Sequence, residues 1–289
     1  MENFSISTID PFTFFPQLRE IPEPPEKLFV VGDLSGIQDK KIIAFVGSRA
    51  CSSYGRMVCR QLVAGLKGYP VVIISGLALG IDAIAHQEAL DSGILTLAFP
   101  GSGLDRNILY PATNRNLAER IVASGGALLS EYPSDTKGAL WTFPRRNRIM
   151  AGIADITIVI EAKEKSGTLI TARLATEYNK TVGAVPGNIS SPVSKGTNWL
   201  LRLGATPITC SEDILLELGF PISEKKTTID ENLPREQKII LNVLAQGPQN
   251  KDELVENTKL DIVTLSIALS TLEITGYIQE NLGKIERIA

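Results

Sequence analysis

The chain has 289 residues, of which 44% are hydrophobic and 21% are charged. This length suits one large domain plus a small one, and this composition excludes wholesale disorder. The formal net charge of −3 excludes a uniformly basic surface, so any nucleic-acid site must be a local cluster of basic side chains.

The cysteines and the apolar runs exclude further classes of protein. The three cysteines have no CxxC spacing, which argues against a disulfide framework or a zinc site and fits a reducing cytosol. The start of the chain does not resemble a signal peptide, and no apolar run approaches the roughly 20 residues of a membrane helix. We therefore expect a cytoplasmic protein that contacts no membrane and holds no metal.

Residues 1–40 contain five prolines before residue 26 and show no regular apolar period. We predict an N-terminal extension that runs extended over the core. Phe12, Phe14 and Phe15 are the side chains expected to pin it there.

Apolar runs then alternate with segments of helical periodicity over residues 41–220. The predicted strands are 42–46, 71–74, 94–99, 127–130, 156–161 and 182–185, and the predicted helices are 54–67, 81–91, 113–124, 168–178 and 212–218. The strands are apolar at odd and even positions alike, as in a parallel sheet covered on both faces. The alternation predicts an α/β domain with a doubly wound, mostly parallel Rossmann-like sheet, whose ligands bind at the carboxyl ends of the strands.

A polar linker at residues 221–233 is predicted to lead into a small domain over 234–289. Helices at 235–245, 251–257 and 262–275, followed by a hairpin across residues 281–283, give the layout of a winged helix. Six Lys and Arg stand against eight Asp and Glu in this tail, and its presumed recognition helix carries Glu273 and no basic residue. Major-groove binding requires basic or amide side chains. The domain is therefore expected to bind protein and to contribute little to DNA affinity.

The apolar residues of the presumed recognition helix are expected to pack. They are Leu265, Ile267, Leu269, Leu272 and Ile274.

Two turns from strand to helix offer groups that bind anions. They are Gly47-Ser48-Arg49 and Ser166-Gly167-Thr168. Backbone N–H groups and the dipole at a helix N-terminus attract phosphate, and an arginine can hold it through two hydrogen bonds. The first turn also fits an ordinary surface arginine, and glycine there would let the backbone approach a ligand.

The strongest indication of a nucleic-acid site is a run of three arginines, an asparagine and two aromatic residues within eight positions. The six residues are Trp141, Phe143, Arg145, Arg146, Asn147 and Arg148. Aromatic faces stack on bases, and arginines bind phosphates. On a helix that begins near Pro144, Arg145 and Arg148 share a face and Arg146 points about 100° away. The pattern favours nucleic-acid binding over a charged amphipathic turn with Phe143 in the core.

The remaining polar residues are given structural roles. No loop carries the glycine fingerprint of a dinucleotide site or a P-loop, so no nucleotide cofactor is expected. Asp82 is expected to cap a helix. His86 has no Cys, Ser or Asp at a spacing typical of a catalytic or metal site, so it is expected to be structural. Glu131 and Glu161 are predicted to end neighbouring strands and could converge, but they do not form an acid/base pair, so no catalytic residue is assigned.

Several of these segments match one family in order and spacing. They are Gly47-Ser48-Arg49, residues 75–86, Phe143-Pro144-Arg145-Arg146-Asn147-Arg148 and residues 166–172. The chain resembles the DNA-processing protein A family (DprA, also called Smf) over residues from about 15 to 220. Its tail resembles the winged-helix domain appended in many members, and the chain is expected to start too late for the helical, SAM-like N-terminal domain that some members carry.

The resemblance implies a function and a site. Members bind single-stranded DNA without sequence preference, load the RecA recombinase onto it during natural transformation and recombination, commonly form dimers, and are not known for catalysis. The DNA pocket would carry over to Gly47, Ser48, Arg49, Phe143, Arg146, Asn147, Ser166, Gly167 and Thr168. Arg145 and Arg148 are added from charge, and Arg115 is expected to replace a lysine that relatives often carry after Tyr110-Pro111.

Two alternatives remain open from the residues. The core also resembles the nucleoside-monophosphate phosphoribohydrolases (LOG-like), which use a glycine-threonine turn followed closely by a glutamate. Here Leu169, Ile170 and Thr171 follow that turn, so the acid is missing. The second alternative is a nucleotide-binding Rossmann protein without catalysis.

For single-stranded DNA binding, the expected mechanism is stoichiometric and not catalytic. Phosphates are expected on Arg49 and a base near Phe143, and dimerisation is expected to multiply the affinity.

Overall fold

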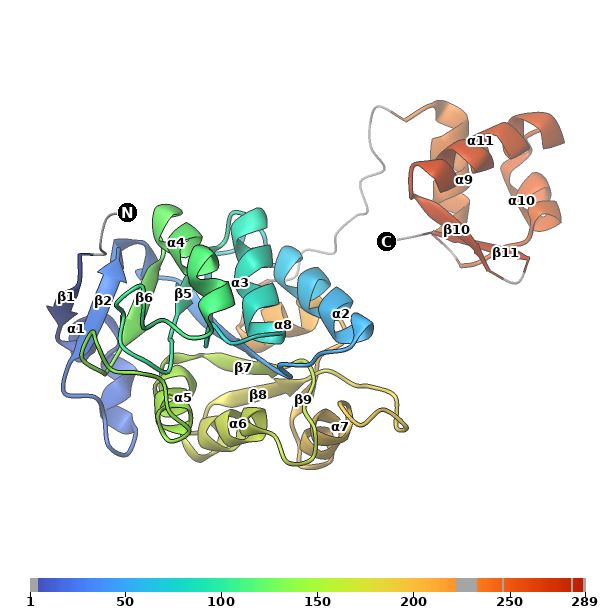
Figure 1. Ribbon diagram of the computed structural model, residues 1–289. Coiled ribbons are helices and arrows are strands. Elements are labelled where there is room, and N and C mark those ends of the chain that lie inside the picture. The colour runs from blue at the N-terminus through green and yellow to red at the C-terminus, as the bar shows by residue number, and fades with distance from the viewer. Residues whose placement is uncertain (1–4, 222–232, 246, 282, 288–289) are drawn as a thin grey trace. The chain divides into compact units, whose positions relative to one another are not determined.

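The computed structural model describes residues 5–221, 233–245, 247–281 and 283–287. The chain divides into two compact units, with the boundary at residues 222/223. The larger unit carries a nine-stranded sheet and the smaller one a bundle of three helices with a hairpin (Figure 1).

The sheet of the larger unit is mostly parallel. Its strands are β1 (Ser7–Ile9), β2 (Leu28–Gly32), β3 (Lys41–Val46), β4 (Val71–Ser75), β5 (Leu95–Ala98), β6 (Ala127–Ser130), β7 (Ile156–Val159), β8 (Thr181–Ala184) and β9 (Thr206–Pro207). Their order is β1-β2-β6-β5-β4-β3-β7-β8-β9. All pairs from β6 to β9 are parallel, and only β1–β2 and β2–β6 are antiparallel. The predicted fold class is therefore confirmed.

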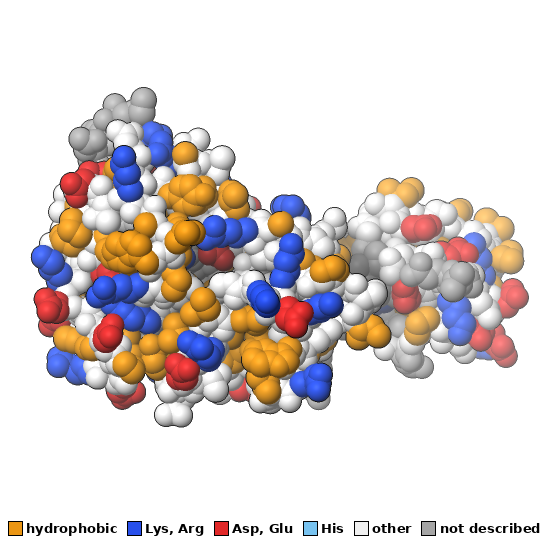
Figure 2. Space-filling model, turned by 60° about the horizontal axis from the view of Figure 1, so that its bottom comes forward, with side chains coloured by type: hydrophobic (Ala, Val, Ile, Leu, Met, Phe, Trp, Pro, Cys, Tyr) orange, Lys and Arg blue, Asp and Glu red, His pale blue; other side chains and the backbone are white. Residues whose placement is uncertain are grey.

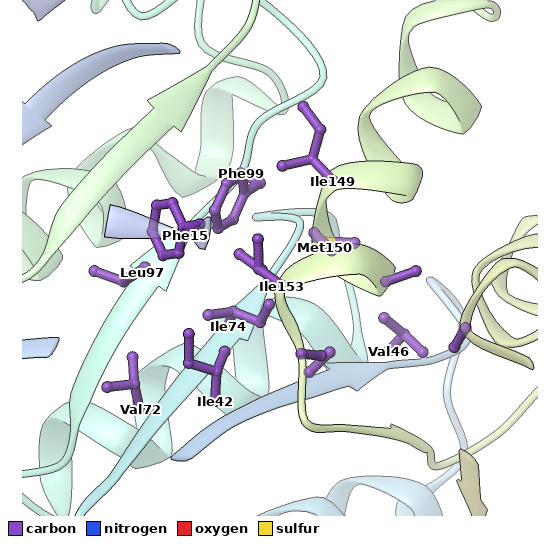
Figure 3. Close-up of a cluster of buried hydrophobic side chains, with 14 of the residues drawn as sticks. Phe15, Ile42, Val46, Val72, Ile74, Leu97, Phe99, Ile149, Met150 and Ile153 are labelled. Carbon is purple, nitrogen blue, oxygen red and sulfur yellow. The ribbon is translucent and has the colours of Figure 1, made fainter. Parts of the chain in front are cut away.

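Helices cover both faces of this sheet (Figure 1). One face carries α2 (Ser53–Ala64), α3 (Ile81–Asp91), α4 (Arg115–Ala123) and α8 (Ser211–Glu217), and the other carries α5 (Thr142–Ile153), α6 (Gly167–Glu177) and α7 (Lys195–Arg202). Because side chains alternate along a strand, Ile43 and Phe45 of β3 join the core under α2 and α3. Ile42 and Val46 point to the other face, where they pack with Ile153 and the rest of the α5 side of the core (Figure 3).

The N-terminal segment does more than lie over the core. After β1 come α1 (Pro11–Phe14) and a 3-10 turn (Pro16–Glu20), and β2 then pairs with β6 and extends the sheet antiparallel. Phe15 is fully buried, with Phe12 and Phe14 partly buried against the same cluster. This pairing covers backbone groups that β6 would otherwise expose at a sheet edge.

The expected convergence of Glu131 and Glu161 is wrong. β5, β4 and β3 separate β6 from β7 in the sheet, so the two carboxylates follow strands that are not neighbours. Chain order alone did not reveal that β3 lies between β4 and β7.

The smaller unit has the winged-helix layout that the sequence predicted. It consists of α9 (Arg235–Leu244), α10 (Lys251–Thr258), α11 (Ile262–Ile274), β10 (Ile278–Asn281) and β11 (Lys284–Arg287), the two strands pairing antiparallel. Its core gathers residues of all three helices and both strands. Most of the expected linker, residues 222–232, and the hairpin residue Leu282 lie outside the described residues.

Helix α11 is apolar on more than its packed side. Leu265, Leu269 and Leu272 are buried as expected, but Ile267 and Ile274 are 65% and 87% exposed, so the expectation that these two pack is wrong. A helix that packs on one side against α9 leaves its opposite side in solvent, whatever residues stand there. Within the described residues, no helix is long and apolar enough to cross a membrane.

His86 lies in the core on α3, as its isolation in the sequence suggested. Its Nδ1 is 2.7 Å from Oγ1 of Thr96, whose hydroxyl donates to the Ile73 carbonyl at 2.9 Å, so the ring nitrogen is the donor to threonine. Burial lowers the pKa of His86 to about 3.

This pKa predicts a pH-dependent stability. In the unfolded chain His86 titrates near pH 6.5, so between about pH 6.5 and 3 the unfolded state binds more protons than the folded one. The stabilisation is complete above pH 6.5 and is lost as the pH falls, at up to ~1.4 kcal/mol per pH unit. Urea unfolding at pH 7, 6 and 5 should show this loss, and His86→Gln should flatten it. The chain has one histidine, so equal slopes in the variant and the wild type would contradict the assignment.

Candidate nucleic-acid interface

A pocket of about 370 Å³ opens at the carboxyl ends of β3 and β7. β4 lies on one side of β3 and β7 on the other, so this is the point where the strand order reverses, and ligands of doubly wound sheets bind there. Nine residues predicted from the sequence line it: Gly47, Ser48, Arg49, Phe143, Arg146, Asn147, Ser166, Gly167 and Thr168. We call it the main pocket. Figure 2 shows a face of the larger unit that is hollowed near its centre, with Lys, Arg and hydrophobic side chains around the hollow.

The loop after β3 is locked onto the start of α3. A Cβ on Gly47 would lie 2.5 Å from Cγ1 of Ile81, so packing against α3 is what requires glycine at this position. Gly80 has a φ of +76°, and a Cβ there would lie 2.2 Å from the Ser48 carbonyl oxygen. From the sequence we expected Gly47 to let the backbone approach a ligand. The structure shows instead that glycine is needed here for a close contact within the protein.

The N-terminus of α2 is already occupied. The Glu161 carboxylate accepts hydrogen bonds from the backbone N–H of Ser52, at 2.9 Å, and from its hydroxyl, and a Cβ on Gly55 would collide with that carboxylate. Ser52 in turn caps the helix by accepting from the Gly55 N–H at 3.1 Å. The expectation that α2 directs an available positive end at the ligand is therefore wrong.

The N-terminus of α6 lies at the main pocket instead. Ser166 caps this helix by accepting from the Thr168 N–H at 3.2 Å, and the Thr168 hydroxyl donates to the Gly47 carbonyl at 3.1 Å, which ties the two loops together. No other described atom lies within 4 Å of a Cβ built on Gly167, so the helix start is open on that side.

Two lysines of the same loop also line the main pocket. Lys163 and Lys165 are both exposed at its rim. Sequence reasoning missed them because Glu161 and Glu164 alternate with them, so the segment shows no basic excess. Their place directly before an open helix N-terminus was the available signal.

Phe143 forms one wall of the main pocket. A Cβ on Gly101 would lie 2.3 Å from its ring, so the loop after β5 is shaped to receive this side chain. The Arg49 guanidinium carbon lies 5.2 Å from the centre of the Phe143 ring, and the Tyr110 ring lies 5.9 Å from it on a neighbouring loop. Arg49 itself is exposed, so its donors remain accessible to an anion.

Arg146 lies at the base of the main pocket. It is 5% exposed, its Nε donates to Oδ1 of Asn147 at 3.0 Å, and its Nη1 has no hydrogen-bond partner among the described residues. A Cβ on Gly76 would lie 2.4 Å from this guanidinium, so the loop after β4 makes room for it. Burial lowers the pKa of Arg146 to about 10, while the nearby Asp82 opposes the shift, so the side chain stays charged at neutral pH.

Asp82 does not cap α3, which corrects the expectation from the sequence. Gly80 stands at the N-cap, and the Asp82 carboxylate accepts from the backbone N–H groups of Gly76 and Ala78 at 3.1 and 3.4 Å. Burial raises the pKa of Asp82, and the charge of Arg146 opposes that rise. Asp82 thus shapes the loop after β4 and places a negative charge beneath Arg146.

Arg145 and Arg148 share a helix face, as predicted, but that face is turned to Glu131. Arg148 is buried and pairs with the Glu131 carboxylate, and the Nε of Arg145 lies 3.7 Å from the same oxygen. Neither residue lines the main pocket. A DNA contact by these two arginines stays a prediction, and Arg115 donates to the carbonyls of Leu109 and Asn107.

The fold and the site define an α/β protein with a basic pocket at the switch point of its sheet and a winged-helix domain after it. The family model described as DNA recombination-mediator protein A matches residues 5–219, and the DprA winged helix domain matches residues 223–284. The chain therefore belongs to the DNA recombination-mediator protein A family.

Relatives of known sequence and structure agree with this assignment. Protein Smf of Escherichia coli (strain K12) is 42% identical over 205 residues, which cover 71% of this chain and 54% of Smf. DNA processing protein DprA of Streptococcus pneumoniae is 41% identical over 203 residues, which cover 70% of each chain. The chain thus spans about half the length of the first relative and about two thirds of the second.

Two solved structures are similar to the larger part of the chain. The X-ray structure of the pneumococcal DprA has a TM-score of 0.68 at 38% identity and covers 76% of this chain and 75% of its own. The Helicobacter pylori structure, described as giving insight into a unique single-stranded DNA binding mode of DNA processing protein A, has a TM-score of 0.67 at 31% identity. It covers 74% of this chain and 96% of its own.

The pairing with Glu131 predicts different effects for its two arginines. Arg148→Ala leaves a buried carboxylate without its main partner and should cost ~3 kcal/mol of unfolding free energy. Arg145→Ala removes an exposed partner and should cost less than ~1 kcal/mol. Arg173→Ala, which breaks an exposed pair with Glu177 on α6, is the matched control for urea unfolding. A loss in Arg148→Ala no larger than in that control would refute the structural role.

Proposed function

We propose that this protein binds single-stranded DNA without sequence preference in the main pocket and passes it to the RecA recombinase, acting as a binding protein and not as an enzyme. One observation carries the proposal. In a chain of net charge −3, four cationic side chains, an aromatic ring and an open helix N-terminus converge on one pocket. The four cations are Arg49, Arg146, Lys163 and Lys165.

These groups divide between phosphate and base. Arg49, the charge of Arg146 and the backbone at the start of α6 are suited to a phosphate, and the face of Phe143 is suited to a base. Stacking on a side chain requires a base that has left its neighbours, which a single strand offers at little cost and a duplex does not. Neither phosphate contacts nor stacking distinguish one base from another, so binding should tolerate any sequence.

A role in recombination is supported by the family match, whereas the RecA recombinase and the homodimer are carried over from the family resemblance of the sequence. The matching family model is described as a recombination mediator, and the structural relative from H. pylori is described as binding single-stranded DNA. A homodimer would join two pockets on one strand, and the second contact would then benefit from a high effective concentration. Action on DNA taken up during natural transformation, in the cytoplasm, follows from the same kinship.

The hydrolase alternative lacks support at the site. A glycosidase of this type needs a carboxylate that faces the substrate. Asp82 is the carboxylate among the pocket-lining residues of the described chain, and two backbone N–H groups already bond it beneath Arg146. Its hydrogen bonds account for its place in the structure without a catalytic role.

The pocket assignment predicts the behaviour of Arg49→Ala. Loss of a charged contact to phosphate should weaken binding of a single-stranded oligonucleotide about tenfold or more. The slope of log K against log salt should also become shallower, by about 0.7 for one phosphate contact. Gel shifts at several salt concentrations, with single-stranded and duplex oligonucleotides, measure both effects, and the variant should also support less recombinase assembly.

Arg120→Ala removes an exposed arginine of α4, outside the main pocket, and serves as the control for a change in total charge. Wild-type protein that bound duplex and single strand equally would contradict the proposal. So would an Arg49→Ala protein that matched the control.

The winged helix is expected to add little to this binding. Helix α11 has no basic residue, and its exposed side includes Ile262, Val263, Ile267 and Ile274. Such a face is suited to a protein and not to phosphates. Deletion of residues 225–289 should therefore change the affinity for single-stranded DNA less than tenfold in the same gel shifts. A larger loss would assign the domain to DNA.

A further inference from the structure

We propose that a second nucleotide of the bound strand stacks on the exposed ring of Tyr110, over a small hollow of about 10 Å³ beside the main pocket. The inference rests on the proposed function and names a further contact of the same strand. We call this place the side hollow. It shares Arg49, Phe143 and Arg146 with the main pocket and adds Tyr110 and Leu79, which come from the loops after β5 and β4.

Tyr110 is exposed in a way that packing does not explain. The residue is 51% exposed, and its hydroxyl has no hydrogen-bond partner among the described residues. A tyrosine that served the core would be buried, with its hydroxyl bonded. The neighbouring Leu79 is also exposed, so the side hollow presents an apolar wall beside an aromatic face.

The two aromatic rings are placed to serve different bases. The rings of Tyr110 and Phe143 have centroids 5.9 Å apart and planes inclined at 45°. At that tilt the two rings are not stacked on each other, and we assign a separate base to each. Consecutive bases on consecutive aromatic side chains are how proteins commonly hold single strands.

Arg49 lines both the main pocket and the side hollow. Its guanidinium carbon is 5.2 Å from the centre of the Phe143 ring. The phosphate that joins two stacked nucleotides would therefore have an exposed cation beside it. This gives Arg49 a role that a single-nucleotide pocket would not require.

The segment that carries Tyr110 is held in place before any ligand binds. The amide of Asn114 donates to the carbonyls of Leu77 and Ala78 at 2.9 and 3.1 Å, which ties this segment to the loop after β4. Arg115 donates to the carbonyls of Leu109 and Asn107 on the other side. A platform ordered in advance loses little conformational entropy on binding.

A competing path leads the other way. A wider groove of about 830 Å³ runs along α6 and α7 and carries Trp199, which is 49% exposed. This groove shares only Lys165 with the main pocket, whereas the side hollow shares the two arginines and the aromatic wall. The shared groups favour the path over Tyr110.

The test compares Tyr110→Ala, Tyr110→Phe, Trp199→Ala and Arg49→Ala in the full-length protein. Fluorescence anisotropy with a labelled oligothymidylate of about eight nucleotides gives the affinities. Tyr110→Ala should weaken binding about tenfold with an unchanged salt slope, because it removes stacking and no charge. Tyr110→Phe keeps the ring and should bind like the wild type, and so should Trp199→Ala. Thermal unfolding confirms that each variant is folded.

A second probe separates stacking from every other effect. In an oligonucleotide of the same length without bases, Tyr110→Ala should bind like the wild type, because no base is left to stack. A full loss with that probe would overturn the proposal, as would a loss in Trp199→Ala but not in Tyr110→Ala, or an unchanged affinity in Tyr110→Ala while Arg49→Ala binds weakly. If Arg49→Ala also bound normally, the proposed function itself would fail, which is a different result.

Discussion

A buried arginine beneath the ligand site constrains the rest of this structure. Taking the Arg146 guanidinium out of water is costly, and the protein offsets part of that cost with Asp82 below it and Asn147 beside it. Gly76 has to be glycine because any side chain there would collide with the guanidinium, and Asp82 bonds the backbone of the same loop. The buried Nη1 is left without a hydrogen-bond partner among the described residues, while the residue as a whole lines the main pocket.

This arrangement explains how a chain of net negative charge can hold a polyanion. Charges separated by more than a Debye length of about 8 Å are largely screened at physiological salt, so the net charge of the chain does not decide the potential at one pocket. Glu161 follows β7 at the site and Glu131 follows β6, and their carboxylates bond to Ser52 and pair with Arg148. Arg49, Lys163 and Lys165 of the main pocket therefore face solvent, whereas Arg146 is buried near Asp82.

Patterns local in sequence were predictable, and pairings distant in sequence were not. The apolar periodicity predicted the first and last residues of α3 and β6 correctly. It could do so because the periods of strands and helices depend on residues that are neighbours along the chain. Helix α7 was missed, since its eight residues include Gly196 and show a short amphipathic period. Six of the nine predicted pocket residues follow from turns at strand ends, and the other three from the run of aromatic and basic residues that forms α5. The pairing of Glu161 with Ser52, 109 positions away, needs the fold and left no local signal.

Helix geometry divides the richest segment of the sequence into two functions. Phe143, Arg146, Asn147 and Met150 are spaced by three and four residues and form one face of α5, which lines the main pocket. Arg145 and Arg148, also three apart, form another face and hold α5 to Glu131 at the end of β6. One of the three arginines, Arg146, thus lines the main pocket, and the other two hold the helix that presents it. The helical period, and not the number of charges in the segment, decides which of them line the pocket.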